Sequence, residues 1–154
     1  MGHIQVARLI PASPIEVFRY ITDLDESAES VSAFLNLEFP KELRLREGME
    51  FEAHVSRFKF RVHFVGRVEE YRPHQRFTYR QVSGFFRAWS HTQTLRAHDA
   101  NTTLLTDFVD FKLPLGIFGS IADDLIVSRD LGRILNERLM KVEEYFLSHR
   151  DLSL

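Results

Sequence analysis

A long region in which apolar and polar residues alternate constrains the fold of this chain more than any other feature. Within Met49–Ser56 and Phe58–Val68, every second side chain is apolar over most of the run. This period of two is typical of strands that bury one face and expose the other. Short turn sequences separate successive runs, and short connections join antiparallel strands. We therefore predict an antiparallel sheet of about six or seven strands, with strands over 4–10, 49–56, 58–68, 76–82, 86–96 and 102–113.

Helices are predicted on both sides of this region. Ser13 is a suitable N-cap, Pro14 suits the first helical position, and Glu16 completes a capping box. A second short helix is predicted over 23–33, where acidic residues gather at the start. From 117 to 149 the apolar spacing becomes helical, which predicts one helix of up to ~30 residues. Its apolar residues are Ile121, Leu125, Leu131, Ile134, Leu135, Leu139, Val142 and Phe146.

The order of these elements predicts an α+β fold in a single domain over residues 1–154. A chain of this length corresponds to one domain and buries a core without disulfides. A long helix with one apolar stripe must bury that stripe, and the apolar face of the sheet is the partner that the sequence provides.

Composition excludes several classes of protein. Apolar residues make up 44% and charged residues 27% of the chain, which excludes intrinsic disorder. No apolar run approaches the ~20 residues of a membrane-spanning helix, so we expect no stable membrane insertion. The chain has no cysteine, which excludes disulfides and cysteine-ligated metals, and its N-terminal sequence has no basic leader. We expect a cytoplasmic protein, and the sequence pattern predicts no particular oligomeric state.

The aromatic residues are unusually rich in phenylalanine. The chain contains 14 Phe but only four Tyr and one Trp. Because the Phe ring has no polar group, this excess indicates either a dry core or the wall of an apolar pocket.

Period-two patterning also predicts which side chains face inward, because the bulkier of the two alternating sets belongs in the core. The inward set on the strands comprises Phe60, Val62, Phe64, Phe77, Tyr79, Gln81, Trp89, His91, Gln93, Asp107, Val109 and Phe111. A turn over 97–101 that pairs Leu95 with Thr103 would place Gln93 opposite Leu105, His91 opposite Asp107 and Trp89 opposite Val109.

Five members of this inward set are polar, namely Tyr79, Gln81, His91, Gln93 and Asp107. Burying such groups unpaired costs ~1–3 kcal/mol each, so they must pair with each other, with water or with a ligand. A His–Asp pair on adjacent strands is more often structural than catalytic, and contact with a ligand is a further interpretation. In the catalytic case, Asp107 would orient His91 as a general base, and Tyr79 would serve as an acid.

The basic residues of the middle segment are predicted on the opposite, convex face, and they are Lys59, Arg61, Arg67, Arg76, Arg80 and Arg87. We interpret this face as solvated and expect no nucleic-acid partner, because exposed aromatics and a recognised reading motif are both missing. The histidine spacing and the glycine pattern match no metal or nucleotide motif, so we expect no metal and no cofactor. Gly132, inside the last helix, leaves two alternatives: room for a ligand, or close contact between helix and sheet.

Several stretches carry a resemblance to a known superfamily, and they are Pro14–Phe18, Arg67–Tyr71, Arg80–Gly84, Trp89–Thr92 and Leu113–Gly116. Together with the order of elements, they resemble the helix-grip superfamily, also called SRPBCC. It joins START lipid-transfer domains, the birch-pollen-allergen fold and polyketide cyclases. The chain is most similar to its bacterial polyketide cyclase/dehydrase-like branch. The resemblance implies a curved sheet wrapped around the long C-terminal helix, with two short helices after the first strand and a cavity between sheet and helix.

That cavity is the expected functional site. We expect it to bind an apolar or aromatic small molecule, such as a lipid, a polyketide or a quinone-like compound, lined by the inward set together with Leu131 and Leu135. One alternative is a polyketide cyclase, aromatase or dehydratase that uses His91 and Asp107. Another is a chaperone-like or regulatory module whose exposed surface matters more than its pocket.

Overall fold

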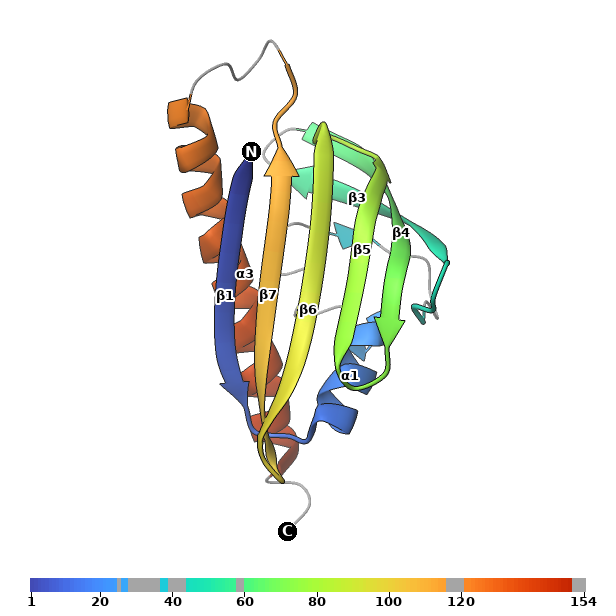
Figure 1. Cartoon of the computed structure of the whole chain (residues 1–154), viewed down its shortest axis with the longest axis vertical. Coiled ribbons are helices and arrows are strands. Elements are labelled where there is room, and N and C mark those ends of the chain that lie inside the picture. Colours follow the sequence, from blue (N-terminus) through green and yellow to red (C-terminus); the bar gives the residue numbers. More distant parts are fainter. Residues whose placement is uncertain (25, 28–36, 39–43, 58–59, 116–120, 151–154) are drawn as a thin grey trace.

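The structure, a computed structural model, describes residues 1–24, 26–27, 37–38, 44–57, 60–115 and 121–150. The elements are β1 (Gly2–Ile10), α1 (Pro14–Thr22), β2 (Leu37–Glu38), β3 (Glu50–Arg57), β4 (Phe60–Arg72), β5 (Arg76–Ser83), β6 (Ala88–Asp99), β7 (Thr102–Lys112) and α3 (Ile121–Arg150). They confirm the predicted α+β order of strands and helices (Figure 1).

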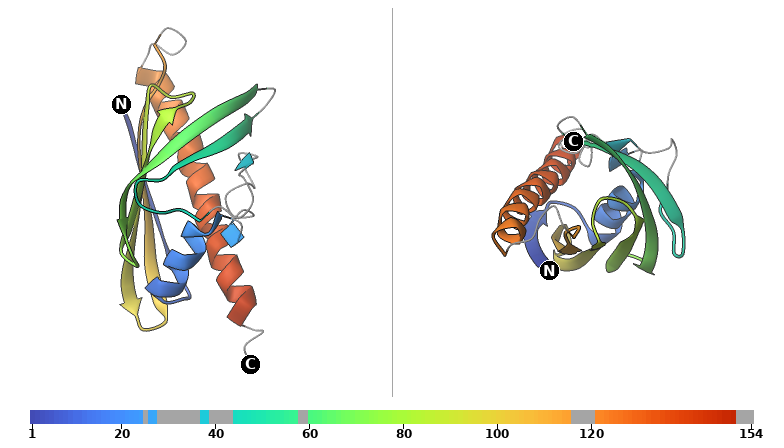
Figure 2. Two further views of the ribbon diagram at one scale, coloured as in Figure 1. Left: turned by 90° about the vertical axis from the view of Figure 1, so that its right-hand side faces the viewer. Right: turned by 90° about the horizontal axis from the view of Figure 1, so that it is seen from above.

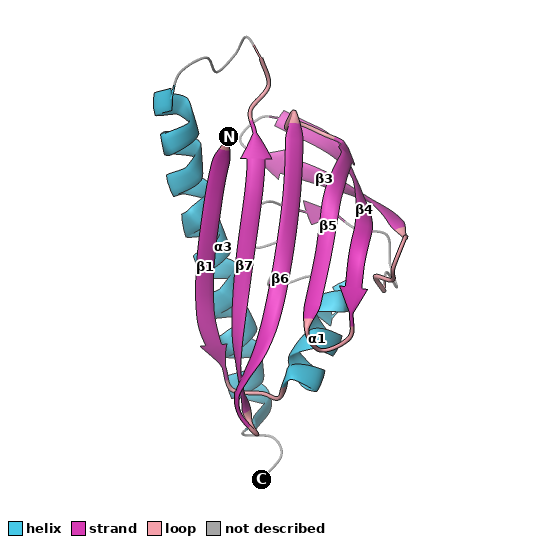
Figure 3. Ribbon diagram, viewed as in Figure 1, coloured by secondary structure: helices cyan, strands magenta, loops and turns pink. Residues whose placement is uncertain are grey.

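The strands form one antiparallel sheet of seven strands, in the order β1-β7-β6-β5-β4-β3-β2. The sheet curves, and α1 and α3 lie on its concave side (Figure 2). Helices and strands are thus divided between two layers, with α3 running along the sheet behind β1 and β7 (Figure 3). This is the helix-grip arrangement that the resemblance implied.

The first helix begins where the sequence predicts it. Ser13 is the N-cap of α1, its Oγ accepts a hydrogen bond from the backbone N–H of Glu16 at 3.4 Å, and Pro14 follows it. The Glu16 carboxylate in turn accepts from the backbone N–H of Ser13 at 2.9 Å, which completes the capping box. Of the second predicted helix, only Leu24 and 26–27 are described as helical, and the stretch 28–33 lies outside the described residues.

The C-terminal helix buries most of its predicted stripe. Leu131, Leu135 and Leu139 are buried, as are Ile134 and Val142. Leu125 was predicted on the same stripe, but its side chain is 61% exposed. Ten residues separate Leu125 from Leu135, which at 3.6 residues per turn rotates Leu125 by about 80° away from the buried line.

Two contacts fix α3 against the edge strand β1. Arg8 of β1 forms an ion pair with Glu143 of α3. A Cβ added at Gly132 would lie 3.8 Å from Cγ2 of Ile4, which is an ordinary van der Waals contact. Gly132 therefore faces the sheet, which favours the second of its two alternatives, close contact between helix and sheet.

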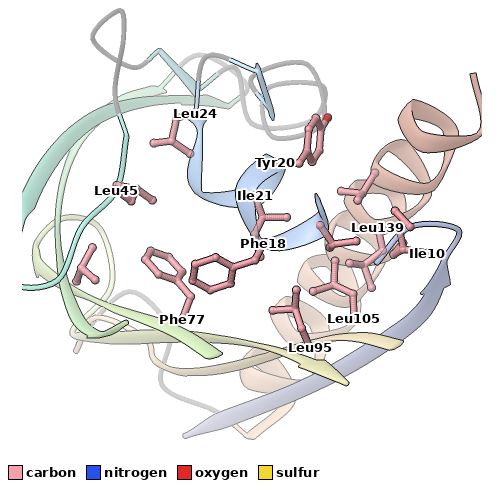
Figure 4. Packing of buried hydrophobic residues seen from close by; sticks show 14 of the residues in the cluster. Ile10, Phe18, Tyr20, Ile21, Leu24, Leu45, Phe77, Leu95, Leu105 and Leu139 are labelled. Carbon is pink, nitrogen blue, oxygen red and sulfur yellow. The ribbon is translucent and has the colours of Figure 1, made fainter. Parts of the chain in front are cut away.

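The buried apolar residues form two clusters. The first joins α1 to Phe77, Leu95, Leu105 and Leu139 (Figure 4). The second contains Val109, Phe111, Leu131, Ile134 and Leu135, with Trp89 and Phe86 packed against it. Along β6, β7 and α3 the first cluster therefore occupies one end and the second cluster the other.

The convex face carries the predicted basic residues. Arg67 and Arg80 are exposed, and they form ion pairs with Glu50 and Glu69 respectively. Arg61, Arg76 and Arg87 are exposed as well, whereas Lys59 lies outside the described residues. Within the described part of the chain, no helix is long and apolar enough to cross a membrane.

Candidate functional site

Five polar side chains meet on the concave face, at the level where the two apolar clusters divide. We call them the polar layer: Tyr79 from β5, His91 and Gln93 from β6, Asp107 from β7 and Arg138 from α3. His91, Gln93 and Asp107 are all buried, with exposed fractions of 5%, 2% and 0%. The polar layer therefore lies inside the protein, with apolar packing above and below it.

Asp107 is the centre of the polar layer. Its Oδ2 accepts a hydrogen bond from Nη1 of Arg138 at 2.7 Å, and its Oδ1 accepts from Nε2 of Gln93 at 3.2 Å. Burial by itself raises the pKa of Asp107, but the positive charge of Arg138 and the contact with His91 outweigh it and hold the pKa at about 2. Asp107 is therefore ionised at neutral pH, and both of its oxygens are occupied by protein groups.

His91 links Asp107 to Tyr79. Its Nδ1 lies 3.1 Å from the Tyr79 hydroxyl, and its Nε2 lies 3.5 Å from Oδ1 of Asp107 without hydrogen-bond geometry. The nearby carboxylate favours the tautomer with the proton on Nε2, so Nδ1 accepts and the Tyr79 hydroxyl donates. Both ring nitrogens of His91 are thus directed at protein groups.

Tyr79 connects the polar layer to a wall of aromatic rings. Burial raises the pKa of Tyr79 to about 12, so its hydroxyl is neutral at physiological pH. Its ring makes edge-to-face contacts with Phe51 at 5.4 Å and with Phe64 at 6.2 Å between centroids. Phe64 and Tyr79 remain half-buried although they face the concave side, so they are not fully covered by their neighbours.

Trp89 places a buried donor beside the polar layer. Its indole packs against Phe86, with 4.8 Å between ring centroids, and belongs to the second apolar cluster. Its Nε1 is buried beside the Tyr79 hydroxyl and offsets part of the rise that burial causes in the Tyr79 pKa, but among the described residues no contact of Nε1 has full hydrogen-bond geometry. A buried N–H with poor hydrogen-bond geometry is incompletely satisfied, so it marks a place where a better acceptor would bind favourably.

The register between β6 and β7 differs from the prediction by two residues. Leu95 pairs with Leu105, Gln93 with Asp107 and His91 with Val109. The cause is a tighter connection than predicted: β6 continues to Asp99, β7 begins at Thr102, and an irregularity between Ala97 and Asp99 takes up the extra residue.

The assignment of side chains to the inward face remains correct, because a register shift of two residues leaves every side chain on the same side of the sheet. The prediction that His91 lies directly opposite Asp107 is wrong. The two residues are diagonal neighbours on adjacent strands, and Gln93 takes the opposite position. Trp89 lies opposite Phe111 instead of Val109.

The other residues of the predicted inward set lie outside the polar layer. Phe77, Val109, Phe111, Leu131 and Leu135 are buried in the two apolar clusters, and Val62 is half-buried. The Gln81 amide donates to the carbonyl of Phe86 at 2.6 Å and accepts from its N–H at 3.3 Å, so it closes the turn between β5 and β6. The side chain of Phe60 lies outside the described residues.

Arg138 is the site residue that the sequence analysis missed. It lies three residues after Leu135 and four after Ile134, on the buried stripe of α3. A cation in the middle of an apolar stripe must find a buried partner, and Asp107 was already assigned to the inward face of the sheet. The spacing of Arg138 from Leu135 and Ile134 is therefore the sequence feature that indicates its role in the site.

A pocket of about 680 Å³ opens elsewhere, at the end of the molecule where α1 lies. It is lined by residues of α1, of the segment 44–49 and of the turn between β4 and β5. None of its residues belongs to the predicted set. The described residues contain no group of three or more His, Asp or Glu side chains that could hold a metal ion.

Solved structures with this fold match almost the whole chain. The protein TTHA0849 from Thermus thermophilus has a TM-score of 0.76 at 20% identity, over 96% of this chain and 99% of that protein. A START superfamily protein from Mycobacterium smegmatis has a TM-score of 0.74 at 14% identity, over 96% and 99%. The ZhuI aromatase/cyclase from Streptomyces sp. R1128 has a TM-score of 0.71 at 18% identity, over 92% and 93%.

The curved sheet, the long C-terminal helix and these structural likenesses define a protein of the helix-grip fold. Within that class, the chain belongs to the family described as polyketide cyclase / dehydrase and lipid transport, whose model matches residues 1–146. The family resemblance found in the sequence is thereby confirmed. Among curated proteins, none matches the chain significantly.

Proposed function

We propose that the protein binds a neutral apolar or aromatic small molecule between the concave face of the sheet and α3. The observation that carries this proposal is the polar layer, together with the indole N–H of Trp89 beside it, whose contact with Tyr79 lacks full hydrogen-bond geometry. A buried ion pair contributes little net stability, and a buried donor with a poor hydrogen bond costs stability, so the stability of the fold does not explain why either is present. A bound molecule with an oxygen acceptor would pair with Trp89.

The charges of the site favour a neutral ligand. Arg138 balances Asp107, and Tyr79 is neutral, so the polar layer has no net charge to attract an ion. The apolar part of the ligand would contact Phe64 and Trp89, which stay half-buried on the concave side. A carbonyl oxygen on an aromatic or alkyl body, as in a quinone or polyketide, has the required chemistry.

The same geometry favours binding over catalysis. A general base needs an atom that reaches the substrate, but both oxygens of Asp107 and both nitrogens of His91 face protein groups. In this proposal Asp107 and Arg138 position His91 and Tyr79, and the aromatic residues hold the ligand.

A second candidate function is a cyclase, aromatase or dehydratase activity. One observation favours it: contacts run without interruption from Tyr79 through His91 to Asp107, which is the order of a proton relay. In that case Nδ1 of His91 would take the proton of the Tyr79 hydroxyl while the Tyr79 oxygen takes a proton from the substrate, and Asp107 would balance the charge of the imidazolium that forms. Turnover abolished in His91→Ala or Asp107→Asn, with ligand affinity retained, would support it.

The binding proposal is tested with two probes of the same shape. Menadione is a neutral quinone, and 2-methylnaphthalene has the same ring system without carbonyl groups. Equilibrium dialysis should give tighter binding of menadione to the wild type, and Trp89→Phe should remove this preference while leaving 2-methylnaphthalene bound. Equal affinities for both probes in the wild type would contradict the role of the indole N–H.

Native mass spectrometry of protein isolated from its own host addresses the natural ligand. The proposal predicts an added mass that belongs to an uncharged, organic-extractable compound. The Trp89→Phe variant is the matched control and should retain less of it. A bound compound that carries a carboxylate or phosphate would contradict a neutral ligand.

A further inference from the structure

The pocket at the α1 end is separate from the polar layer and shares no residue with it. Its volume of about 680 Å³ falls within the range of ~300–1,000 Å³ that is typical of small-molecule sites. Three segments line it: α1, the stretch from Arg44 to Met49, and the turn that joins β4 to β5. In Figure 4 the ring of Phe18 points from α1 toward Phe77, and Leu45 lies across the interior from them.

The floor of this pocket is apolar. Phe18 and Leu45 are 3% and 4% exposed, so they are fixed in the core and expose only an edge. Tyr71 and Met49 are half-buried beside them, and the rings of Phe18 and Tyr71 meet edge to face at 5.1 Å. The floor can therefore cover the apolar body of a ligand.

The rim is positively charged. Three arginines line the pocket, Arg19, Arg44 and Arg46, against one aspartate, Asp23. Asp23 forms an ion pair with Arg44 at 3.2 Å, and its other oxygen accepts from the N–H of Glu26 at 3.3 Å. Within the described part of the chain, Arg19 and Arg46 form no ion pair. Two guanidinium groups thus line the pocket in addition to that of Arg44.

His74 gives the pocket a strained wall. It follows Pro73 in the turn between β4 and β5, and its φ is 65°, in the left-handed region that favours glycine. The hydrogen bond from the N–H of Gln75 to the carbonyl of Arg72 closes this turn. A positive φ after proline is the position that type II turns normally give to Gly or Asn. The His74 ring packs on Phe18 with 5.8 Å between centroids, so a strained residue contributes directly to the pocket wall.

We propose that this pocket is a second binding site, which takes a small amphipathic anion: an apolar body with one carboxylate, sulfonate or phosphate group. The body lies on Phe18, Leu45 and Tyr71, and the anionic group meets Arg19 and Arg46. The excess of positive charge at the rim excludes the neutral ligand of the polar layer as the preferred occupant. Guanidinium groups suit such anions because their N–H groups form charge-assisted hydrogen bonds.

Two dyes with one common body test the proposal. The dye 8-anilinonaphthalene-1-sulfonate is an anion, and N-phenyl-1-naphthylamine is the same body without the sulfonate. Fluorescence titration of the Arg19→Ala, Arg46→Ala double variant should show about tenfold weaker binding of the sulfonate dye and unchanged binding of the neutral dye. The affinity of the wild type for the sulfonate dye should also fall as salt is raised.

A charge-matched control separates the pocket from the overall charge of the protein. Arg96 and Arg129 are exposed and lie outside the pocket, so Arg96→Ala, Arg129→Ala removes the same two charges elsewhere. This control should bind the sulfonate dye as the wild type does. If both double variants lose affinity equally, or if neither does, the proposed site is wrong. Menadione binding should be unchanged in both variants, which keeps this test independent of the polar layer.

Discussion

Arg138 of α3 and Asp107 of β7 form an ion pair inside the protein, with 2.7 Å between Nη1 and Oδ2. The Asp107 side chain is fully buried, and that of Arg138 is 11% exposed. The pair connects the C-terminal helix to the middle of the sheet. It also fixes the carboxylate that lies 3.5 Å from Nε2 of His91, so the position of the helix and the geometry of the polar layer depend on each other.

Breaking this pair from one side should be costly. Arg138→Met leaves a buried carboxylate without its cation, and we expect a loss of about 3–5 kcal/mol in the free energy of unfolding. Arg133→Met is the control, because Arg133 lies on the same helix in an exposed pair with Asp130 and should cost less than about 1 kcal/mol. Urea denaturation measures both, and similar losses would contradict the assignment. Adding Asp107→Asn to Arg138→Met should recover part of the stability.

The titration of Asp107 should make the free energy of unfolding depend on pH in the acidic range. Its pKa is about 2 in the folded protein and 3.8 as the ordinary value, so its ionised form stabilises the fold above pH 3.8. That contribution is lost as the pH falls from 3.8 through 2, and it amounts to about 2 kcal/mol. Unfolding curves at several pH values should show this loss in the wild type. A parallel profile in Asp107→Asn would assign the loss to other groups.

Gly132 offers a stabilising substitution. Its added Cβ would make an ordinary contact with Ile4, and alanine is favoured over glycine within a helix, so Gly132→Ala should gain about 1 kcal/mol. Gly66→Ala is the opposite case, because its Cβ would collide with the ring of Phe51. Thermal unfolding should move in opposite directions for the two variants. Reduced menadione affinity in Gly132→Ala would restore the alternative that this glycine makes room for a ligand.

The strain at His74 can be isolated by comparing two variants. Both His74→Gly and His74→Ala remove the ring, but only glycine adopts a positive φ without strain. The glycine variant should therefore be about 1 kcal/mol more stable than the alanine variant. Equal stability would mean that the turn relaxes to a negative φ at this position.

Local rules predicted the elements of the fold well. The capping box spans only the four residues from Ser13 to Glu16, and the alternation of strand residues has a period of two, so both can be recognised in a single sequence. The register between β6 and β7 depends on how the turn closes. The irregularity between Ala97 and Asp99 leaves no trace in the alternation of residues, so the register could not be predicted from it.

Long-range pairing limited the prediction of the site. Asp107 and His91 were placed on the correct face, but their charges and hydrogen bonds depend on Arg138, which is 31 residues from Asp107 along the chain. The pocket at the α1 end joins three separate segments, and its arginines carry no common spacing. Only the folded chain brings such residues together.

Trp89 is the only tryptophan of the chain, so the protein labelled with nitrogen-15 has a single indole N–H signal in its NMR spectrum. The most direct measurement of the central claim is the response of this signal to menadione. We predict a saturable downfield shift, because the indole gains a better acceptor, and a smaller shift with 2-methylnaphthalene. An indole signal that stays in place while menadione is bound would contradict the proposed site.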